Sequence, residues 1–426
     1  MKKFAVLGLA VVLVIAFTVP ATAFESVFGG YWRTRAYMQK DFSGDDTKAL
    51  DRTLVDTRTR LYYTAIFNEN LKFVNKFEFD AAWGGATAGY GDIGADGKDV
   101  EVKNSYVDFT LGAINSKIGV QSYMLGRGFL FKDDFAGAVI TYKAEAFELP
   151  IFWVKAYEGS NGDNNGDVDY YGIAPKFSLG DMGAVQPFFV WVTSDCAEDY
   201  DATWPQSDLE LEDLDIYYLG FDADMNFDMV SVWLTAMYQF GEVDAFEGEL
   251  GSISADVSAW LAAIGAKVNF DTFDLHGQIF YASGDDDLDD DDVEEFVPLK
   301  GQDYHWAEIM GGGMFDNAGF SNNQSNNAPG WNNITNVIAY NIGANFKVMD
   351  DLSLRADLWY AQLVEEEDLP DDELGFEVDF GMTYKLMDNL NLDVVAAYLF
   401  AGDATTEDVA NDENPYEIGA QLSLSF

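Results

Sequence analysis

The last thirteen residues of the chain, 414–426, alternate strictly between apolar and small or polar side chains. In an extended strand, one face would be apolar up to the final residue: Tyr416, Ile418, Ala420, Leu422, Leu424 and Phe426. The other face would carry Glu417, Gly419, Gln421, Ser423 and Ser425. A period of two suits a strand that crosses a membrane, with lipid on one side and water on the other, because such a crossing needs about ten residues. The pattern therefore favours a fold that crosses a membrane with strands.

The amino terminus has the parts of an export signal. Lys2 and Lys3 are followed by an apolar run over 4–17 and by Ala21-Thr22-Ala23, which fits a cleavage site. We therefore expect a signal peptide over 1–23 and a single barrel domain over 24–426. An uncleaved anchor is the alternative, and it is disfavoured because the apolar run is short for a spanning helix.

The composition argues against several classes of function. A formal net charge of −50 opposes binding to a nucleic-acid backbone. One cysteine permits no internal disulfide, and two histidines leave little material for zinc or triad chemistry. Aromatic residues make up 15% of the chain, as expected if aromatic girdles lie at two membrane interfaces. We expect no enzyme activity, no cofactor and no nucleic-acid partner.

Alternating segments recur along the chain and are separated by turn-forming residues. The pattern predicts eighteen strands, at 25–40, 52–67, 71–83, 99–112, 117–126, 135–143, 147–157, 168–179, 184–193, 211–223, 228–240, 254–269, 273–282, 335–347, 352–363, 374–386, 391–400 and 414–426. Sixteen strands are the alternative, because the region 194–270 is the least regular.

The connections between these strands alternate between short and long. The short ones, such as Asn68-Glu69-Asn70, are rich in Asn, Asp and Gly, as tight hairpins require. The long ones include 127–134, 241–253 and the 52-residue segment 283–334. This rhythm predicts an all-β, antiparallel up-and-down transmembrane barrel with short periplasmic turns and long acidic extracellular loops.

Charged residues share one face of the predicted strand 71–83: Lys72, Lys76, Glu78 and Asp80. Charges are costly in a soluble β core but not along a water-filled lumen, so this face is expected to line a pore. The segment 99–112 alternates poorly, which predicts a β-bulge there.

Four of the seven arginines lie on the first two predicted strands: Arg33, Arg35, Arg58 and Arg60. A turn near Asp46-Thr47 would place Arg33 opposite Arg60. It would also place Arg35 opposite Arg58, so that all four side chains face the lumen near mid-height.

The short turn after the second strand sets the next register. It would place Arg60 opposite Glu78, and Arg58 opposite Asp80. Two interpretations stay open: an ordinary cross-strand ladder that neutralises the arginines, or a basic wall that selects or orients anionic solutes. The predicted pore-lining residues are Arg33, Arg35, Arg58, Arg60, Glu78, Asp80, Lys72 and Lys76.

Basic residues are concentrated early in the chain. Of those that follow residue 23, sixteen lie between Arg33 and Lys155, and six come later. One side of the barrel should therefore be enriched in basic residues and the rest acidic, which would create a transverse field across the pore.

The segment 285–295 contains nine acidic residues. Three interpretations stay open for the long connection around it: a solvated loop, a loop folded into the pore, or a divalent-cation site that bridges neighbouring lipopolysaccharide. Another stretch has spacing like the start of a calcium loop: Asp163, Asn165, Asp167 and Asp169. Gly172 stands where an EF-hand has its closing Glu, so no firm metal site is predicted.

The signal sequence, the eighteen-segment alternation and the terminal Phe426 resemble a Gram-negative outer-membrane porin. The Arg-x-Arg pairs at 33/35 and 58/60 and the Asn-Glu-Asn-Leu-Lys turn at 68–72 are similar to the opening strands of alginate-export-type porins. That resemblance implies an eighteen-stranded conduit with an arginine-lined pore, located in the outer membrane. The acidity of this chain and its few later arginines depart from the pattern.

The sequence thus predicts a passive diffusion channel for small hydrophilic solutes or ions, with an arginine-lined wall at mid-height. The alternatives are a structural or adhesive barrel with cation-binding acidic loops, and an export conduit for an anionic polysaccharide. Outer-membrane lipid and lipopolysaccharide are the expected surroundings, and the sequence leaves open whether the barrel works alone or as a homotrimer.

Overall fold

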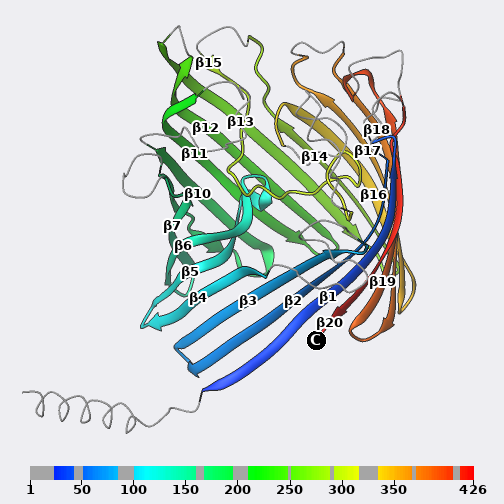
Figure 1. Cartoon of the computed structure of the whole chain (residues 1–426), viewed down its shortest axis with the longest axis horizontal. Helices are drawn as coiled ribbons and strands as arrows, with labels where there is room; N and C mark the ends of the chain where they lie inside the picture. The colour runs from blue at the N-terminus through cyan, green and yellow to red at the C-terminus, as the bar shows by residue number, and fades with distance from the viewer. Residues whose placement is uncertain are drawn as a thin grey trace, which may run out of the picture.

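The protein forms one closed β-barrel (Figure 1). The computed structural model describes residues 24–42, 51–84, 100–159, 167–194, 210–247, 251–287, 292–315, 334–366, 371–405 and 413–426. Within these residues, no helix is long and apolar enough to cross a membrane.

All strands belong to a single sheet. They are β1 (Glu25–Lys40), β2 (Arg52–Asn68), β3 (Leu71–Ala82), β4 (Glu101–Leu111), β5 (Ile114–Leu125), β6 (Phe131–Lys143), β7 (Phe147–Tyr157), β8 (Val168–Ile173), β9 (Lys176–Ser178), β10 (Gly183–Ser194), β11 (Glu210–Phe227), β12 (Val230–Glu247), β13 (Gly251–Asn269), β14 (Phe273–Ala282), β15 (Asp292–Val293), β16 (Val337–Met349), β17 (Leu352–Leu363), β18 (Glu373–Met387), β19 (Leu390–Ala401) and β20 (Tyr416–Ser425). Short 3-10 turns lie at Gly126–Gly128, Gly180–Met182 and Asp403–Thr405.

The barrel wall has eighteen strands, as predicted. β8 and β9 both lie between β7 and β10 and form one interrupted strand. β15 is a two-residue strand that pairs in parallel with β13 and belongs to a loop. The sixteen-strand alternative is therefore wrong.

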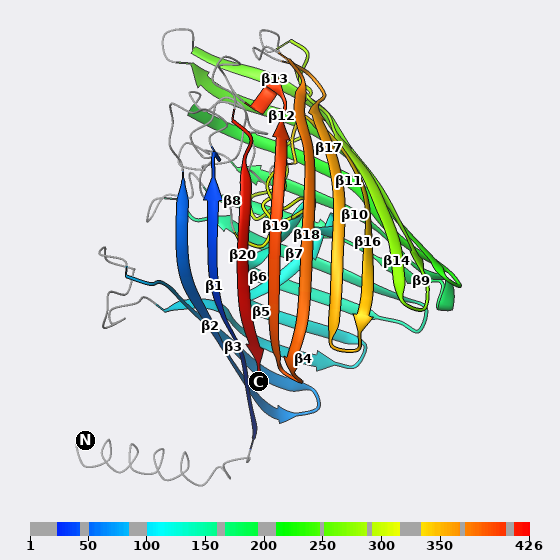
Figure 2. The same ribbon diagram turned by 90° about the vertical axis from the view of Figure 1, so that its right-hand side faces the viewer.

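The first and last strands close the wall. β1 pairs with β20 from Tyr31–Ser425 to Lys40–Tyr416, and the two lie side by side in Figure 2. Phe426 extends the ladder, because its N–H donates to Gly30 and its carbonyl accepts from Gly30 at 3.1 and 2.8 Å. The strict alternation of the last strand thus places its apolar residues outward and completes the barrel.

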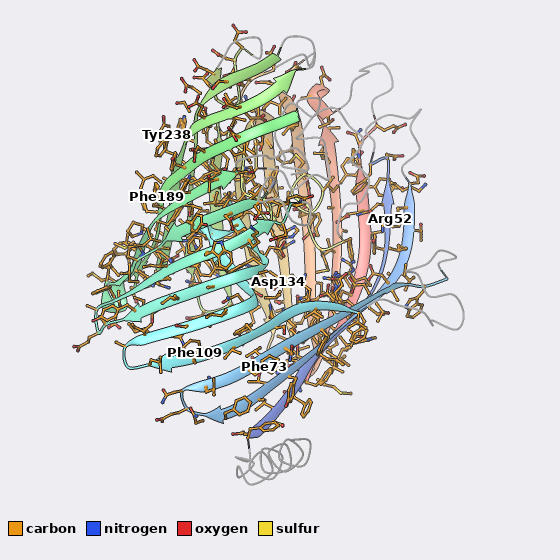
Figure 3. The ribbon with its side chains drawn as sticks, turned by 60° about the vertical axis from the view of Figure 1, so that its left-hand side comes forward. Arg52, Phe73, Phe109, Asp134, Phe189 and Tyr238 are labelled. Carbon is orange, nitrogen blue, oxygen red and sulfur yellow. The ribbon has the colours of Figure 1, made fainter. Side chains whose placement is uncertain are left out.

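Aromatic side chains form continuous contacts on the outer face of the wall. Tyr171, Trp191, Tyr217 and Phe240 follow one another across neighbouring strands, with ring centroids 5.3–6.3 Å apart. Figure 3 shows Phe189 and Tyr238 along the same wall. Such rings suit a membrane interface, where one side of the residue meets lipid and the other meets water.

The strand pattern was correct in its main features, with one error of length. The short turns lie where predicted, and the expected bulge is present in β4, because Lys76 pairs with Asn104 while Phe77 pairs with Val102. The long connection predicted over 241–253 is wrong, since β12 runs to Glu247 and β13 starts at Gly251. Acidic residues such as Glu242 and Asp244 are typical of loops by composition, but here the pairing of β12 with β13 keeps them in strands.

Two connections turn into the barrel instead of outward (Figure 1). The first, 126–130, is the part of the predicted 127–134 loop that precedes β6, and the second comprises residues 292–315, which we name the pore loop. Their apolar side chains pack with inward-facing strand residues into one buried cluster, in which Phe129, Leu130, Phe296 and Ile309 are fully buried. The solvated interpretation of the long acidic connection is therefore wrong for this part of it.

Candidate functional site

The arginine cluster lies on the lumenal side of β1 and β2, but in a register two residues from the predicted one. Arg33 lies opposite Arg58, and Arg35 lies opposite Asp56. The predicted pairs, Arg33 with Arg60 and Arg35 with Arg58, are wrong because the connection between β1 and β2 is long and does not fix the register. The shift keeps all four arginines on one face and gives Arg35 a carboxylate partner.

The next register, between β2 and β3, is as predicted. Arg58 pairs with Asp80, with Nε 2.8 Å from Oδ1, and Arg60 forms an ion pair with Glu78. Arg58 also lies 3.5 Å from Glu78. Glu78 is only 3% exposed, so these guanidinium groups supply the compensating contacts that its buried carboxylate needs.

Arginines and carboxylates thus form a ladder across three strands, in which Arg35, Arg58 and Arg60 each have a carboxylate partner. Arg35 adds a pair in which its Nε donates to Asp56 at 3.0 Å. Three acids, Asp56, Glu78 and Asp80, therefore balance most of the charge of the arginines. This arrangement matches the ladder interpretation more closely than that of an uncompensated basic wall.

A second charged region lies nearer the short-turn end of the wall. A cavity of about 530 Å³ is lined there by side chains from β3 to β10, which we name the lysine chamber. Its lining carries four lysines, Lys72, Lys117, Lys143 and Lys176, and three acids, Glu69, Asp108 and Glu148. In the described part of the chain, only Lys143 among them lies within 4.0 Å of a carboxylate, namely Glu148 at 3.9 Å.

Sequence reasoning found Lys72 but missed the other chamber lysines. They come from β5, β6 and β9, and only the pairing of successive hairpins brings them together. Lys76 lies outside this chamber and places its ammonium group 5.5 Å from the ring centroid of Tyr62. The alternation along each strand predicts that these lysines face the lumen. It does not predict that they lie at the same height along the barrel axis.

The opposite wall has a different character. A cavity of about 410 Å³ there includes His276, Asn341, Asn345, Arg355 and Asp357 among its lining residues. His276 faces the lumen, and its ring nitrogens lie 2.8 Å from Asp357 and 3.1 Å from Asp274. Carboxylates therefore engage this histidine on both sides.

The segment 126–130 and the pore loop meet inside the lumen. Phe129 stacks on Tyr304 with centroids 3.6 Å apart, and Lys132 donates its N–H to the carbonyl of Gly301 at 2.9 Å. Lys132 also forms an ion pair with Asp303 at 2.9 Å. These contacts make a bar across part of the barrel.

The turn that carries Phe129 requires glycine. Gly126, Arg127 and Gly128 all have positive φ angles, of 59°, 56° and 93°, a region that residues with a side chain rarely adopt. Arg127 adopts this conformation although it is not a glycine. Its side chain is held in place by two contacts: the guanidinium lies 4.7 Å from the ring centroid of Trp233 and pairs with Asp224 at 2.8 Å.

Titratable groups on the pore loop are shifted by their contacts. The His305 ring and Lys132 lower the pKa of Asp303 to about 2, and the Asp303 carboxylate raises the pKa of His305. Burial raises the pKa of Tyr304 to about 12. Near neutral pH Asp303 is therefore ionised and Tyr304 is a neutral hydrogen-bond donor, whose hydroxyl donates to Gln278 at 3.0 Å.

The end of the pore loop rests on the seam between the first and last strands. Phe315 stacks on Tyr37 with centroids 4.9 Å apart, and Arg35 donates to the carbonyl of Met314 at 2.8 Å. Arg355 of β17 forms an ion pair with Glu308 of the loop. The loop thus contacts β11 and β12 at Val297, β6 at Gly301 and Asp303, and β1 at its end, and none of its described residues lines the lysine chamber.

The calcium-like stretch is only partly described. Asp163 and Asn165 lie outside the described residues, while Asp167 and Asp169 both accept hydrogen bonds from Lys155. Among the described residues, no group of three or more His, Cys, Asp or Glu side chains could hold a metal ion.

The fold resembles solved outer-membrane porins. The chain aligns with the BenF-like porin from Pseudomonas fluorescens Pf-5 at 12% identity and a TM-score of 0.56, covering 94% of this chain and 99% of that one. OccAB1 from Acinetobacter baumannii gives 12% identity and a TM-score of 0.56, with 94% and 97% coverage. OccK2 (OpdF) from Pseudomonas aeruginosa, solved in complex with glucuronate, gives 11% and 0.54, with 94% and 98% coverage.

Comparison with curated proteins gives no match. The model of a family described as alginate export matches residues 24–416, which is nearly the whole barrel. The fold and the family together place the protein in the outer membrane of a Gram-negative cell. The chain belongs to the alginate export family of outer-membrane β-barrels.

Proposed function

We propose that the barrel is a passive porin for small hydrophilic solutes, with no catalytic step. The observation that carries this proposal is the lysine chamber, a polar cavity of about 530 Å³ in the part of the lumen that the pore loop leaves free. Hydroxyl and amide groups lie beside its lysines, including Thr110, Asn115, Thr141 and Gln186. Such a lining replaces part of the hydration shell of a polar solute.

We further propose that the wall favours anions. Lys72, Lys117 and Lys176 have no carboxylate within 4.0 Å in the described part of the chain, so their ammonium groups stay available to a solute. The four lysines of the lining outnumber its three acids, Glu69, Asp108 and Glu148. The arginine–carboxylate ladder above the chamber contributes fixed dipoles more than net charge. The chamber therefore sets charge preference, and the ladder orients the solute.

Export of an anionic polysaccharide is the second candidate, because the family model is described as alginate export. The same lysines would serve such a chain. The inward-folded segments, however, fill much of the lumen with apolar side chains, which favours small solutes over a polymer. On the outer face we propose contact with lipid and lipopolysaccharide through the aromatic residues.

Planar-bilayer recording in a KCl gradient tests the proposal. We expect steady unitary currents and a reversal potential that indicates anion preference. Replacing Lys72, Lys117 and Lys176 together by Ala should move the reversal potential toward cations, while Lys347→Ala, at a lysine that pairs with Asp350 across a turn, should not. Absence of current would contradict the porin proposal and favour an adhesive or structural barrel.

A further inference from the structure

Acidic side chains of the wall hold the backbone of the pore loop. The two oxygens of Glu377 accept the N–H groups of Ile309 and Met310 at 2.6 and 2.8 Å. Asp379 accepts the N–H of Glu308 at 3.3 Å. Both acids belong to β18, so a single strand supplies the principal seat of the loop.

The seat is buried and lacks cationic partners. We include Glu417 of β20 in the seat, because it lies within electrostatic reach of Asp379 and Glu308. Glu377, Asp379 and Glu417 are 0%, 1% and 1% exposed. In the described part of the chain, none of these three carboxyl groups has a Lys or Arg nitrogen within 4.0 Å. One oxygen of Asp379 and one of Glu417 are also buried there without any hydrogen-bond partner.

The neighbouring charged groups are already matched. Arg355 of β17 forms ion pairs with Glu308 and with Asp357, the latter at 3.2 Å. Arg35 of β1 pairs with Asp56 of β2 at 2.6 Å. Both arginines are therefore engaged with other carboxylates, and they reach Asp379 and Glu417 only through longer-range electrostatics.

A further contact comes from β1. Gln39 donates to one oxygen of Glu417 at 3.0 Å, and the other oxygen is the unpartnered one. Glu308, Asp379 and Arg35 lie within electrostatic reach of this carboxyl group. Because like charges buried at close range repel and are poorly solvated, a seat with every acid ionised would be unstable.

We propose that bound protons hold the pore loop in place. Asp379 and Glu417 are neutral while the loop is docked, and Glu377 receives the two N–H groups. When alkaline conditions remove the protons, repulsion between the seat and Glu308 drives the loop from the wall and widens the channel. This regulation rests on the proposed porin function, because it is the pore that the loop narrows.

Single-channel conductance from about pH 5 to about pH 9 is the first measurement. We expect the unitary conductance of the wild type to rise roughly twofold toward alkaline pH. The double variant Asp379→Asn and Glu417→Gln cannot ionise, so its conductance should stay low and flat. Asp388→Asn, at an exposed turn, should keep the wild-type response.

Hydrogen–deuterium exchange of residues 306–315 reports the seat without any current. After correction for intrinsic rates, protection of Ile309 and Met310 should fall about tenfold across the same range in the wild type but not in the double variant. Exchange that is flat with pH in the wild type would overturn the proposal, even if the double variant fails to fold. A channel that does not conduct while exchange responds would reject the porin function and retain the proton-dependent seat.

Discussion

Gly419 of β20 lies directly against Phe315 of the pore loop. A Cβ atom at position 419 would come within 2.5 Å of the Phe315 ring and of the Tyr37 Cβ. Only glycine at position 419 therefore leaves room for the Phe315 ring to pack against β20.

Substitution of Gly419 should displace the end of the pore loop. We expect Gly419→Ala to raise unitary conductance, because overpacking of about 1–3 kcal/mol opposes docking of Phe315. Gly381→Ala is the matched control, since a Cβ there would have its nearest neighbour at 3.3 Å on Arg355. Equal conductance in the two variants would show that Phe315 does not narrow the channel.

Removal of Arg60 should destabilise the barrel. Arg60→Ala would leave Glu78, which is nearly fully buried, with only the more distant Arg58, at a cost of about 3–5 kcal/mol. Unfolding in denaturant, followed by Trp fluorescence in detergent micelles, measures the loss. Lys143→Ala breaks an exposed pair with Glu148 and should cost no more than about 1 kcal/mol; a similar loss for both would contradict the ladder model.

The contact between Phe129 and Tyr304 should control the bar across the lumen. Phe129 is fully buried, so Phe129→Ala is expected to cost about 3–5 kcal/mol and to increase current fluctuations. Phe129→Leu keeps most of the apolar volume and should show a smaller change in both quantities. Unchanged current fluctuations in the Ala variant would mean that the contact between the segment 126–130 and the pore loop does not depend on the Phe129 ring.

The pair Asp303–His305 should titrate in a defined direction. The pKa of His305 is raised, so the charged pair is fully present below its ordinary value of about 6.5 and is lost as pH rises through the raised value. The lowered pKa of Asp303, about 2, means that its contribution is lost only as pH falls through that value. NMR of labelled histidine should show the His305 midpoint falling in Asp303→Asn, with His276 as internal control; an unchanged midpoint would exclude the pairing.

The sequence predicted the wall well because each strand carries its own signal. Inward and outward faces follow from alternation alone, and the short turn after Asn68 fixed the pairing of Arg58 with Asp80. The loop between β1 and β2 is too long to set a register, which explains the error at Arg33. A correct register there needed the packing of both strands against their neighbours.

The interior could not be predicted in the same way. The pore loop enters the barrel because Ile309, Met310 and Phe315 find apolar and hydrogen-bonding partners on strands distant in sequence. The acidic segment 285–295, which leads into the loop, favours a solvated loop by composition alone. The chamber lysines likewise meet only after the hairpins have assembled.

The position of Phe315 has a consequence for assembly. Its contacts at Tyr37 and Gly419 come from the first and the last strand, which lie side by side only when the sheet is a ring. The resting place of the ring therefore does not exist in an open sheet. During folding, β1 must therefore pair with β20 before Phe315 can pack against both strands. Once packed, Phe315 stabilises the pairing of β1 with β20 from inside the barrel.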